Sequence, residues 1–421
     1  MNRITYRIRL GLFASLILLA GCNAQESATG ATASTAQAQE STSAYTVTVT
    51  ATVPEDAPTV YLSGNLPELG PWHPKRLAMT GTGTQRSATL SVPAGHVLRY
   101  KITAGSWERE GLGPSGTVMP EFTATIDSDK DLTASIAGFR VDPATLIEDW
   151  EGSGVRGTLV YWQDMPSEFL DEPRHIVTWL PPDYDANSDK QYRVIYTHDG
   201  QNLFDPRLSY TNVDWGIDEA MMRGVADGDY EPAIVVGIWN TPERLFEYSP
   251  WHKAPEYARF MLEELMPRVE AQFNVLTGPQ NTFVMGSSMG GLVSWYLLKE
   301  HADVFGACGC VSSHLTWSPQ MIEWIAGRDP TTADPTPFIL SDIANGETMP
   351  TSVRMYFDYG TEELDAAYEA PHLAVKQWLT EQGFEEGENL AMQKFEGAGH
   401  KESAWRERVD QQLLWMLGDA S

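Results

Sequence analysis

The feature that most constrains this chain is a Gly-x-Ser-x-Gly motif that spans residues 286–290. Residues 282–285 before it are apolar or β-branched, as in a short buried strand, and residues 292–300 after it are typical of a helix. Glycines on both sides of Ser288 remove the Cβ atoms that would clash in a sharp turn. The motif therefore predicts a strained strand-to-helix turn, in which the Ser288 hydroxyl projects above a sheet beside a helix N-terminus.

Strand-like and helix-like segments alternate from residue 157 to the C-terminus. Short apolar strands are expected at residues 157–161, 175–180, 193–197, 233–238, 282–285, 307–311, 353–357 and 392–395. Residues 256–273 carry an apolar row with helical spacing. This alternation predicts a mostly parallel sheet with helices on both faces, the α/β-hydrolase arrangement. The first two strands follow each other without a helix, which favours antiparallel strands at the sheet edge.

A serine is a weak nucleophile unless a base takes its proton and an acid orients that base. Ser288 is the expected nucleophile, and the histidines that follow it are His301, His314, His372 and His400. His301 ends the helix after the turn, and His372 is expected on the surface. His400 comes just after the last strand, at the sheet edge where the turn of Ser288 also opens, so we expect it to be the base. Residues 358–365 offer four carboxylates for the acid.

Several short signatures in residues 157–417 resemble the esterase superfamily that includes feruloyl and enterochelin esterases. They are Thr-His-Asp-Gly-Gln-Asn at 197–202, Gly-Ile-Trp-Asn at 237–240, Arg244, Glu-Tyr-Ser-Pro at 247–250, the Ser288 motif, Gly-Thr-Glu-Glu at 360–363, Gly399-His400 and Ala404-Trp405. The resemblance implies that Glu363 is the acid, with Glu362 as the alternative. It also implies an oxyanion hole formed by the backbone N–H groups of Met289 and Gln201.

Loops at the same sheet edge supply candidates for substrate binding, which are Trp215, Trp239, Arg244, His314 and Trp317. The alternative for each is packing beneath its loop, and an ion pair between Arg244 and Glu247 would also shape the pocket. His198 and Asp199 are followed by Asp205, Asp214 and Asp218, but their spacing fits no metal-ligand motif. Support of the oxyanion loop is the favoured interpretation, and we expect no metal and no cofactor.

Residues 45–138 contain short alternating runs separated by Pro, Gly and Asn, which predicts a small antiparallel, immunoglobulin-like β-sandwich. Their landmarks are Gly-Asn-x-x-Glu-Leu-Gly-x-Trp at 64–72, Pro-Ala-Gly at 93–95, Tyr-Lys at 100–101 and Trp-Glu at 107–108. This order resembles starch-binding carbohydrate-binding modules, although Gly113, Pro114 and Ser115 depart from the family's pattern. The resemblance implies that Trp72 and Trp107 stack on sugar rings with Lys101 nearby; the alternative is that both tryptophans pack in a core or between domains.

The N-terminal segment reads as an export signal. Residues 1–21 combine three arginines with a short apolar run, and Cys22 follows Ala20 and Gly21 as in the bacterial lipoprotein box. We expect Cys22 to be acylated, residues 22–44 to be a flexible tether, and residues 139–156 to link the sandwich to an esterase domain at 157–421. Residue 23, directly after this cysteine, is asparagine and not the aspartate that resembles an inner-membrane retention signal, so we expect the outer membrane. Cys308 and Cys310 are expected to be buried free thiols, because a bridge between them would strain the strand.

Together these features predict a lipid-anchored serine esterase that hydrolyses carboxylic esters, with acyl, acetyl or feruloyl groups on carbohydrate as the expected substrates. The alternatives are a siderophore esterase of the enterochelin type, a sugar acyltransferase and a non-catalytic glycan-binding lipoprotein. The expected partners are an ester substrate, a polysaccharide held by the N-terminal module, and a membrane. The formal net charge of −28 argues against nucleic acid.

Overall fold

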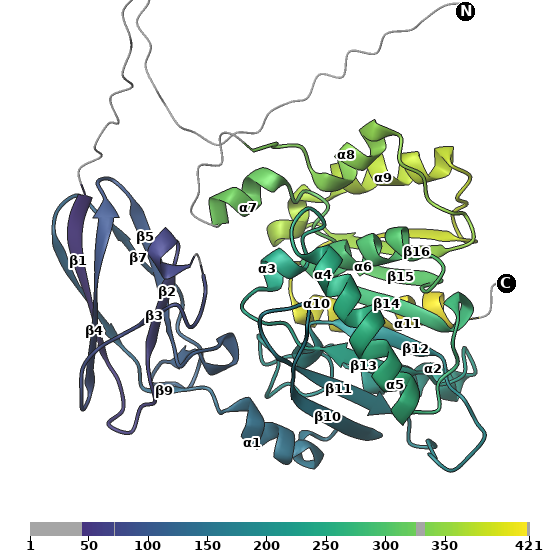
Figure 1. Cartoon of the computed structure of the whole chain (residues 1–421), viewed down its shortest axis with the longest axis horizontal. Helices are drawn as coiled ribbons and strands as arrows, with labels where there is room; N and C mark the ends of the chain where they lie inside the picture. Colours follow the sequence, from purple (N-terminus) through teal and green to yellow (C-terminus); the bar gives the residue numbers. More distant parts are fainter. Residues whose placement is uncertain (1–43, 71, 326–332, 419–421) are drawn as a thin grey trace, which may run out of the picture. The chain divides into compact units, whose positions relative to one another are not determined.

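The central sheet of the C-terminal part contains eight strands (Figure 1). In chain order they are β10 (Thr158–Met165), β11 (Arg174–Leu180), β12 (Val194–His198), β13 (Ile234–Ile238), β14 (Thr282–Ser287), β15 (Ala307–Val311), β16 (Arg354–Gly360) and β17 (Leu390–Phe395). Their order across the sheet is β10-β11-β13-β12-β14-β15-β16-β17. The pairs β10–β11 and β11–β13 are antiparallel and the others are parallel, so the predicted strands and the antiparallel edge are confirmed.

The structure is a computed structural model that describes residues 44–70, 72–325 and 333–418. The expected signal peptide, Cys22 and almost all of the expected tether lie outside the described residues. Within the described ranges, no helix combines the length and the apolar character needed to cross a bilayer.

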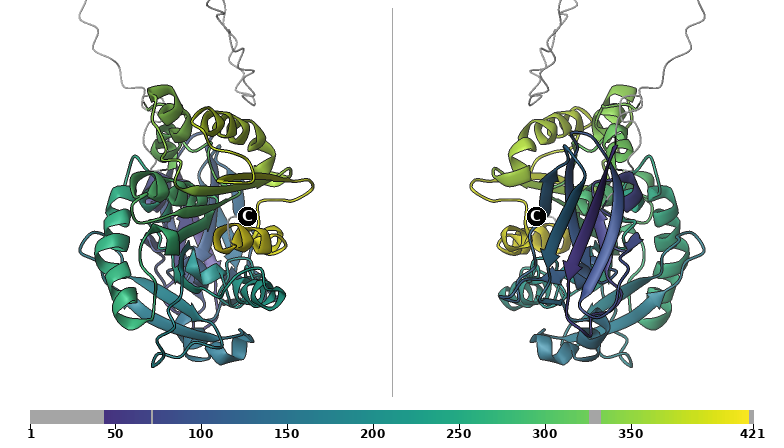
Figure 2. Two further views of the ribbon diagram at one scale, coloured as in Figure 1. Left: turned by 90° about the vertical axis from the view of Figure 1, so that its right-hand side faces the viewer. Right: turned by 90° about the vertical axis from the view of Figure 1, so that its left-hand side faces the viewer.

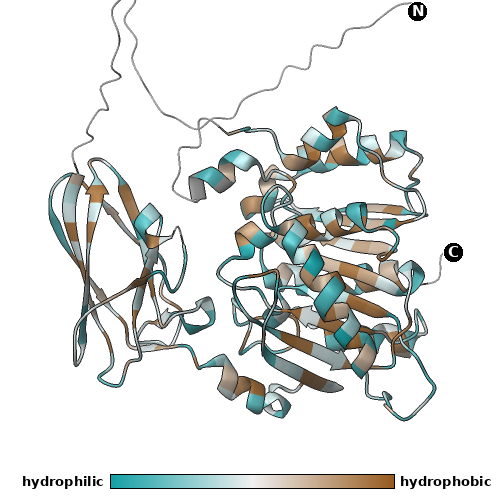
Figure 3. Cartoon of the chain, in the orientation of Figure 1, coloured by the Kyte–Doolittle hydropathy of each residue, from teal (hydrophilic) through white to brown (hydrophobic). Residues whose placement is uncertain are grey.

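Helices cover both faces of the sheet because successive strand residues point to opposite sides. Val194 and Tyr196 belong to one apolar core, and Ile195 between them belongs to the other. The first core is closed by α4 (Ala254–Arg259), α5 (Met266–Gln272), α6 (Met289–Glu300) and α9 (Glu369–Glu381). The second is closed by α2 (Ile217–Asp227) and α11 (Val409–Leu417). Figure 2 shows α5 and α11 on opposite sides of the strands, which are mainly apolar in Figure 3.

The remaining helices are short and lie near the ends of the strands. They are α1 (Pro143–Glu148), α3 (Arg244–Glu247), α7 (Pro319–Ile325), α8 (Phe338–Asn345) and α10 (Glu402–Arg406). The helix predicted at 256–273 is continuous, but a π-helical segment, η5 (Phe260–Leu265), joins α4 to α5. Cys308 and Cys310 are buried and free, as expected.

The N-terminal β domain, residues 44–139, has two main sheets around one apolar core. Its strands are β1 (Ala44–Thr52), β2 (Tyr61–Gly64), β3 (Leu77–Ala78), β4 (Gln85–Pro93), β5 (Val97–Thr103), β6 (Gly111–Leu112), β7 (Phe122–Thr125), β8 (Lys130–Ser135) and β9 (Gly138–Phe139). One sheet has the order β4-β1-β8 and the other has the order β3-β2-β5-β7. The pairing is antiparallel except between β1 and β8.

The segment expected to be a plain linker at 139–156 is folded and attached. It contains α1, and Ile147 from this helix is buried in the second core of the C-terminal domain. Arg140 is 8% exposed, and its guanidinium donates hydrogen bonds to the carbonyl oxygens of Arg207, Ser209 and Tyr210 at 3.1, 2.6 and 3.2 Å. The described residues from 44 to 418 accordingly belong to one compact unit.

Candidate active site

The Ser288 turn has the geometry that the motif predicts. Ser288 lies between β14 and α6 with φ 56° and ψ −120°, a strained conformation for a residue with a side chain. Its backbone N–H donates to the Val311 carbonyl at 2.9 Å, which holds the turn against the end of β15. The strain is therefore fixed by the surrounding sheet.

The two glycines of the motif are required by close contacts. A Cβ atom on Gly286 would lie 2.6 Å from the carbonyl carbon of Gly290, so a side chain there would force the turn open. A Cβ atom on Gly290 would lie 3.3 Å from an Asp199 oxygen. The glycines thus bring the serine turn against the loop that follows β12.

His400 and Asp365 form a hydrogen-bonded pair at the same edge of the sheet. His400 Nδ1 lies 2.6 Å from Asp365 Oδ1, and Asp365 is fully buried. The other oxygen, Oδ2, accepts hydrogen bonds from Ser312 Oγ at 2.6 Å and from the Gly360 N–H at 2.7 Å. Burial alone would raise the pKa of this carboxyl, but its hydrogen bonds to His400, Ser312 and Gly360 lower it. Asp365 is therefore held as an anion that orients the imidazole.

This geometry shows that the prediction of Glu363 as the acid that orients the histidine is wrong. Glu363 does not contact His400; its Oε1 accepts from Lys401 Nζ at 3.1 Å, and its side chain is 49% exposed. Glu362 is also exposed. After β16 the chain enters a 3-10 turn, Glu363–Ala367, that directs Glu363 outward and Asp365 inward. Asp365 was within the carboxylate-rich stretch, but its inward direction depends on this turn.

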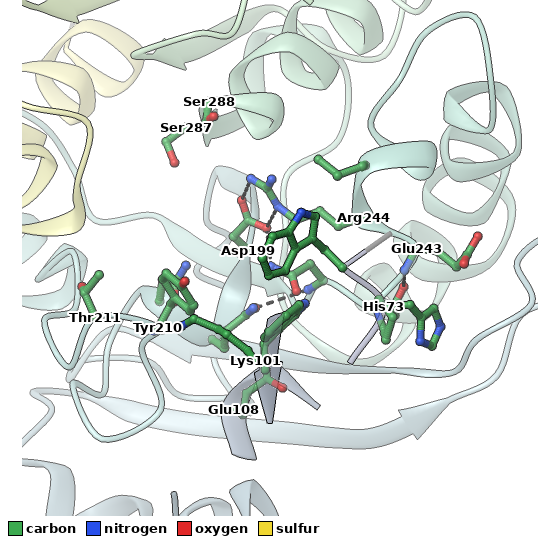
Figure 4. A pocket seen from close by; sticks show the side chains of 18 of the residues that line it. His73, Lys101, Glu108, Asp199, Tyr210, Thr211, Glu243, Arg244, Ser287 and Ser288 are labelled. Atoms are coloured by element: carbon green, nitrogen blue, oxygen red, sulfur yellow. Dashed lines mark hydrogen bonds and ion pairs between the residues drawn. The ribbon is translucent and has the colours of Figure 1, made fainter. Parts of the chain in front are cut away.

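Ser288 and His400 line one cavity of about 760 Å³ (Figure 4). The imidazole of His400 packs edge-on against Trp405 and Tyr368, with ring centroids 5.2 and 5.7 Å apart. These contacts fix the plane of the ring. The serine and the histidine therefore open to the same space at one edge of the sheet.

Tyr368 is a neighbour of the serine that sequence reasoning missed. Its hydroxyl hydrogen-bonds to the side chain of Ser288 and to His314 Nδ1. Burial raises the pKa of Tyr368, so the phenol stays protonated, and burial lowers the pKa of His314 to about 3, so the imidazole stays neutral. No motif marks Tyr368, since it comes from a turn that packs back on the site.

The loop after β12 is held by a network around Asp199. Asp199 has φ 58°, and its carboxylate accepts two hydrogen bonds from Arg244, both at 2.7 Å, and one from Asn240 at 2.6 Å. Gln201 lines the cavity in the next turn. Met289 begins α6 directly after Ser288. The oxyanion donors at Met289 and Gln201 stay predictions.

Arg244 lines the cavity, but its ion pair differs from the expected one. Its partner is Asp199, whereas Glu247 forms a buried pair with Arg174 at 2.7 and 3.1 Å. His198 beside Asp199 is buried, which lowers its pKa to about 3, and its Nδ1 lies 2.9 Å from the Tyr257 hydroxyl. This histidine supports the loop from below.

The other expected substrate-binding residues pack beneath their loops. Trp215, Trp239, His314 and Trp317 are between 0% and 6% exposed and do not line the cavity. Trp215 packs on Trp405 with ring centroids 5.6 Å apart, and the Trp317 indole donates to Ser249 Oγ at 3.0 Å. His372, which was expected on the surface, is fully buried beside Tyr368. For Trp215, Trp239, His314 and Trp317, the alternative interpretation, packing beneath the loops, is therefore the correct one.

The N-terminal β domain also contributes to this cavity. Trp72, Lys101 and Trp107, the expected carbohydrate-binding residues, line it together with Ser288 and His400. Residues of the C-terminal domain that sequence reasoning missed complete the lining, and they include Tyr210, Thr211, Phe246 and Glu402. Tyr210 and Thr211 lie on a loop, Phe246 lies in α3 and Glu402 begins α10; none belongs to a motif, so only the fold could reveal them.

Comparisons with known proteins match the C-terminal part of the chain to one family. A family model described as "Putative esterase" matches residues 167–416. The chain is 24% identical over 265 residues to the uncharacterized protein YbbA of Bacillus subtilis (strain 168), covering 58% of this chain and 93% of YbbA. It is 33% identical over 99 residues to an alpha-amylase of Niallia circulans, covering 24% of this chain and 8% of the amylase. A solved ferulic acid esterase superposes with a TM-score of 0.48 at 20% identity, covering 62% of this chain and 98% of that one.

Proposed function

Because this chain belongs to the esterase family, and is accordingly a carboxylic ester hydrolase, we propose that it removes acyl, acetyl or feruloyl groups from carbohydrate esters, with Ser288 as the nucleophile. The observation that carries the proposal is the shared cavity of Ser288 and His400, with Asp365 bonded to the far side of the imidazole. This is the order of nucleophile, base and orienting acid that acyl transfer needs.

The proposed reaction has two steps. Ser288 Oγ forms a bond to the ester carbonyl carbon while His400 Nε2 takes its proton, since Nδ1 is engaged by Asp365. The tetrahedral intermediate breaks its bond to the sugar oxygen, which takes that proton from His400 and leaves as the alcohol, and an acyl-serine remains. Water then attacks the acyl carbonyl through the same base and releases the carboxylic acid. Backbone N–H groups of Met289 and Gln201 stabilise the negative charge in both steps.

The size and composition of the cavity support a substrate with a compact alcohol group. A volume of about 760 Å³ lies within the range of small-molecule sites. Its wall alternates aromatic rings with amide, hydroxyl and carboxylate groups, which suits the apolar face and polar rim of a sugar.

The decisive test is Ser288→Ala. With a short-chain nitrophenyl ester, kcat should fall by at least about 10⁴-fold, because the nucleophile is absent. A fluorophosphonate probe should add its mass to Ser288 in the wild-type protein and not to the variant. Thermal unfolding of the variant controls for folding. Unchanged hydrolysis by the variant, or labelling of the variant at another residue, would contradict the assignment of Ser288 as the nucleophile.

The cellular location is part of the same proposal, and it is supported by the Cys22 motif alone. Acylation of Cys22 would hold the esterase on a bacterial membrane, with the outer membrane as the proposed site. Expression in a Gram-negative host with a labelled fatty acid should label the wild-type chain, and Cys22→Ala should be unlabelled and released from the membrane fraction. Labelling of the alanine variant would exclude this anchor.

A further inference from the structure

We propose that the N-terminal β domain forms the alcohol-binding wall of the catalytic cavity, where Trp72 and Trp107 hold the sugar ring of the same ester that Ser288 cleaves. This inference rests on the proposed function and specifies how the site selects the alcohol. It assigns to the β domain a role in substrate specificity, in place of a separate attachment point for a polymer.

The first argument is the composition of the cavity. Trp72, Lys101, Trp107 and Glu108 from the β domain line the same space as Ser288 and His400 from the C-terminal domain. Figure 4 shows Lys101 and Glu108 on one side of this space and the Asp199–Arg244 pair and Ser288 across it. A sugar bound to both tryptophans would therefore lie in the same cavity as the serine.

The second argument is the attachment of the wall. Arg140 follows the last strand of the β domain, and it is buried with three hydrogen bonds to carbonyl oxygens of residues 207–210. Tyr210, one of these acceptors, and the next residue, Thr211, line the cavity. This contact between the two domains thus helps to set the position of the wall relative to the site, because a guanidinium with several acceptors is a specific anchor.

The third argument is the electrostatic character of the wall. Two of its cations are paired within the protein: Lys101 Nζ lies 2.5 Å from Glu110 Oε1, and Arg99 forms an ion pair with Glu121. Across the cavity, Arg244 is paired with Asp199. These paired charges have little net attraction for an anionic ligand, whereas their oxygens and N–H groups can still bind hydroxyls.

The tryptophans supply the apolar part of such a site. Trp72 and Trp107 are both half-buried, so each keeps an accessible ring surface at the cavity. The Arg99 guanidinium lies 5.8 Å from the centroid of the Trp72 ring, which helps to hold that ring in place. Aromatic faces beside neutral hydrogen-bonding groups favour a neutral polyhydroxyl ligand, a sugar, over a carboxylate, a phosphate or an anionic siderophore.

The shared site makes a prediction that a separate polymer site does not. Maltotriose and methyl glucoside, used as soluble probes, should inhibit hydrolysis of 4-nitrophenyl acetate competitively by the full chain. Calorimetric titration of the same protein should give a dissociation constant that agrees with the inhibition constant. Sugar binding without inhibition would overturn the proposal, and so would the absence of sugar binding to an active enzyme.

Substitutions of the two tryptophans test whether they cause the preference for a sugar ester. We compare kcat/KM for an acetylated methyl glucoside with kcat/KM for 4-nitrophenyl acetate, which has no sugar. In Trp72→Ala and Trp107→Ala this ratio should fall by about 10- to 30-fold, as expected for a buried aromatic anchor. Trp107→Phe should recover part of it, which separates stacking from a folding defect. Tyr45→Ala is the matched control, because Tyr45 is a half-buried aromatic of the same domain outside the cavity.

The outcomes separate this inference from the esterase proposal. If the wild-type protein hydrolysed neither ester, the proposed function would be refuted. Hydrolysis of both esters with an unchanged ratio in the two alanine variants would refute only the role of the wall.

Discussion

At the scale of single residues, the site depends on which carboxylate reaches the imidazole. Asp365 and Glu363 are two positions apart and both follow β16, yet only Asp365 is buried and bonded to His400. Since a triad acid fixes the tautomer and orientation of its histidine, the two residues should differ sharply when each is replaced by its amide.

We therefore predict that Asp365→Asn lowers kcat by about 10³- to 10⁴-fold, because the amide stabilises the wrong imidazole tautomer. Glu363→Gln is the matched control and should stay within about threefold of the wild-type protein, since it breaks only an exposed ion pair. Steady-state kinetics with a nitrophenyl ester measure both. The reverse ranking would restore Glu363 as the acid.

Much of the site could be predicted from the sequence where the chemistry is carried by a local motif. Ser288 has flanking glycines, and His400 has a fixed position after the last strand. Asp365 and Tyr368 could not be predicted, because their orientation depends on a 3-10 turn that packs against Ser312 and Gly360. Trp215 and Trp239 were predicted to bind substrate but are buried. An aromatic residue on a loop has the same sequence signal whether it faces a ligand or a core.

At the scale of secondary structure elements, the strands were predicted closely because buried parallel strands are continuous apolar runs.

The start of α2 carries a cluster of acidic side chains that no sequence periodicity indicates. Asp214, Asp218 and Glu219 bring oxygens within 4.8 Å of one another, and Arg406 pairs with Asp214 at 2.6 Å and with Glu219 at 2.8 Å. One cation thus faces three acids at the N-terminus of a helix.

This cluster should make stability depend on pH. Burial and the neighbouring Glu219 raise the pKa of Asp218 to about 7, so the folded state binds this proton more tightly than the unfolded state. The stabilising contribution is present at acidic pH and is lost as the pH rises through about 7. Asp218→Asn removes this titration and keeps an oxygen for the Arg156 N–H at 2.9 Å.

Because the loss begins near the unfolded pKa of about 4, we expect the stability gained by Asp218→Asn over the wild-type protein to be larger at pH 8 than at pH 5, by about 1–3 kcal/mol. Denaturant titrations at the two pH values measure the difference. A variant that is less stable at pH 8 would show that the ionised carboxylate is favourable in this cluster.

At the scale of the whole molecule, the two domains form one structural unit, and Arg140 is one of the residues that join them. The sequence analysis placed a linker at residues 139–156, between the predicted sandwich and the predicted esterase domain. The buried guanidinium and its three carbonyl acceptors depend on a loop about 70 residues away, which a local pattern cannot reveal.

Arg140→Met should keep much of the side chain's apolar contact but remove the hydrogen bonds. We expect the wild-type chain to unfold in one calorimetric transition and Arg140→Met to unfold in a broader or split one, because leaving buried carbonyls unpaired costs about 1–3 kcal/mol for each group. Arg109→Met is a control, since Arg109 pairs with the exposed Asp142 in the same region. One unchanged transition in Arg140→Met would mean that other contacts hold the domains together.

The placement of β1 has a mechanical consequence. This strand begins at Ala44, the first described residue, and lies in the middle of its sheet with β4 on one side and β8 on the other. A pull on the chain at that end would act along a strand held by two hydrogen-bond ladders, which share the load in shear. The domain should therefore resist unravelling when force is applied at residue 44 along β1.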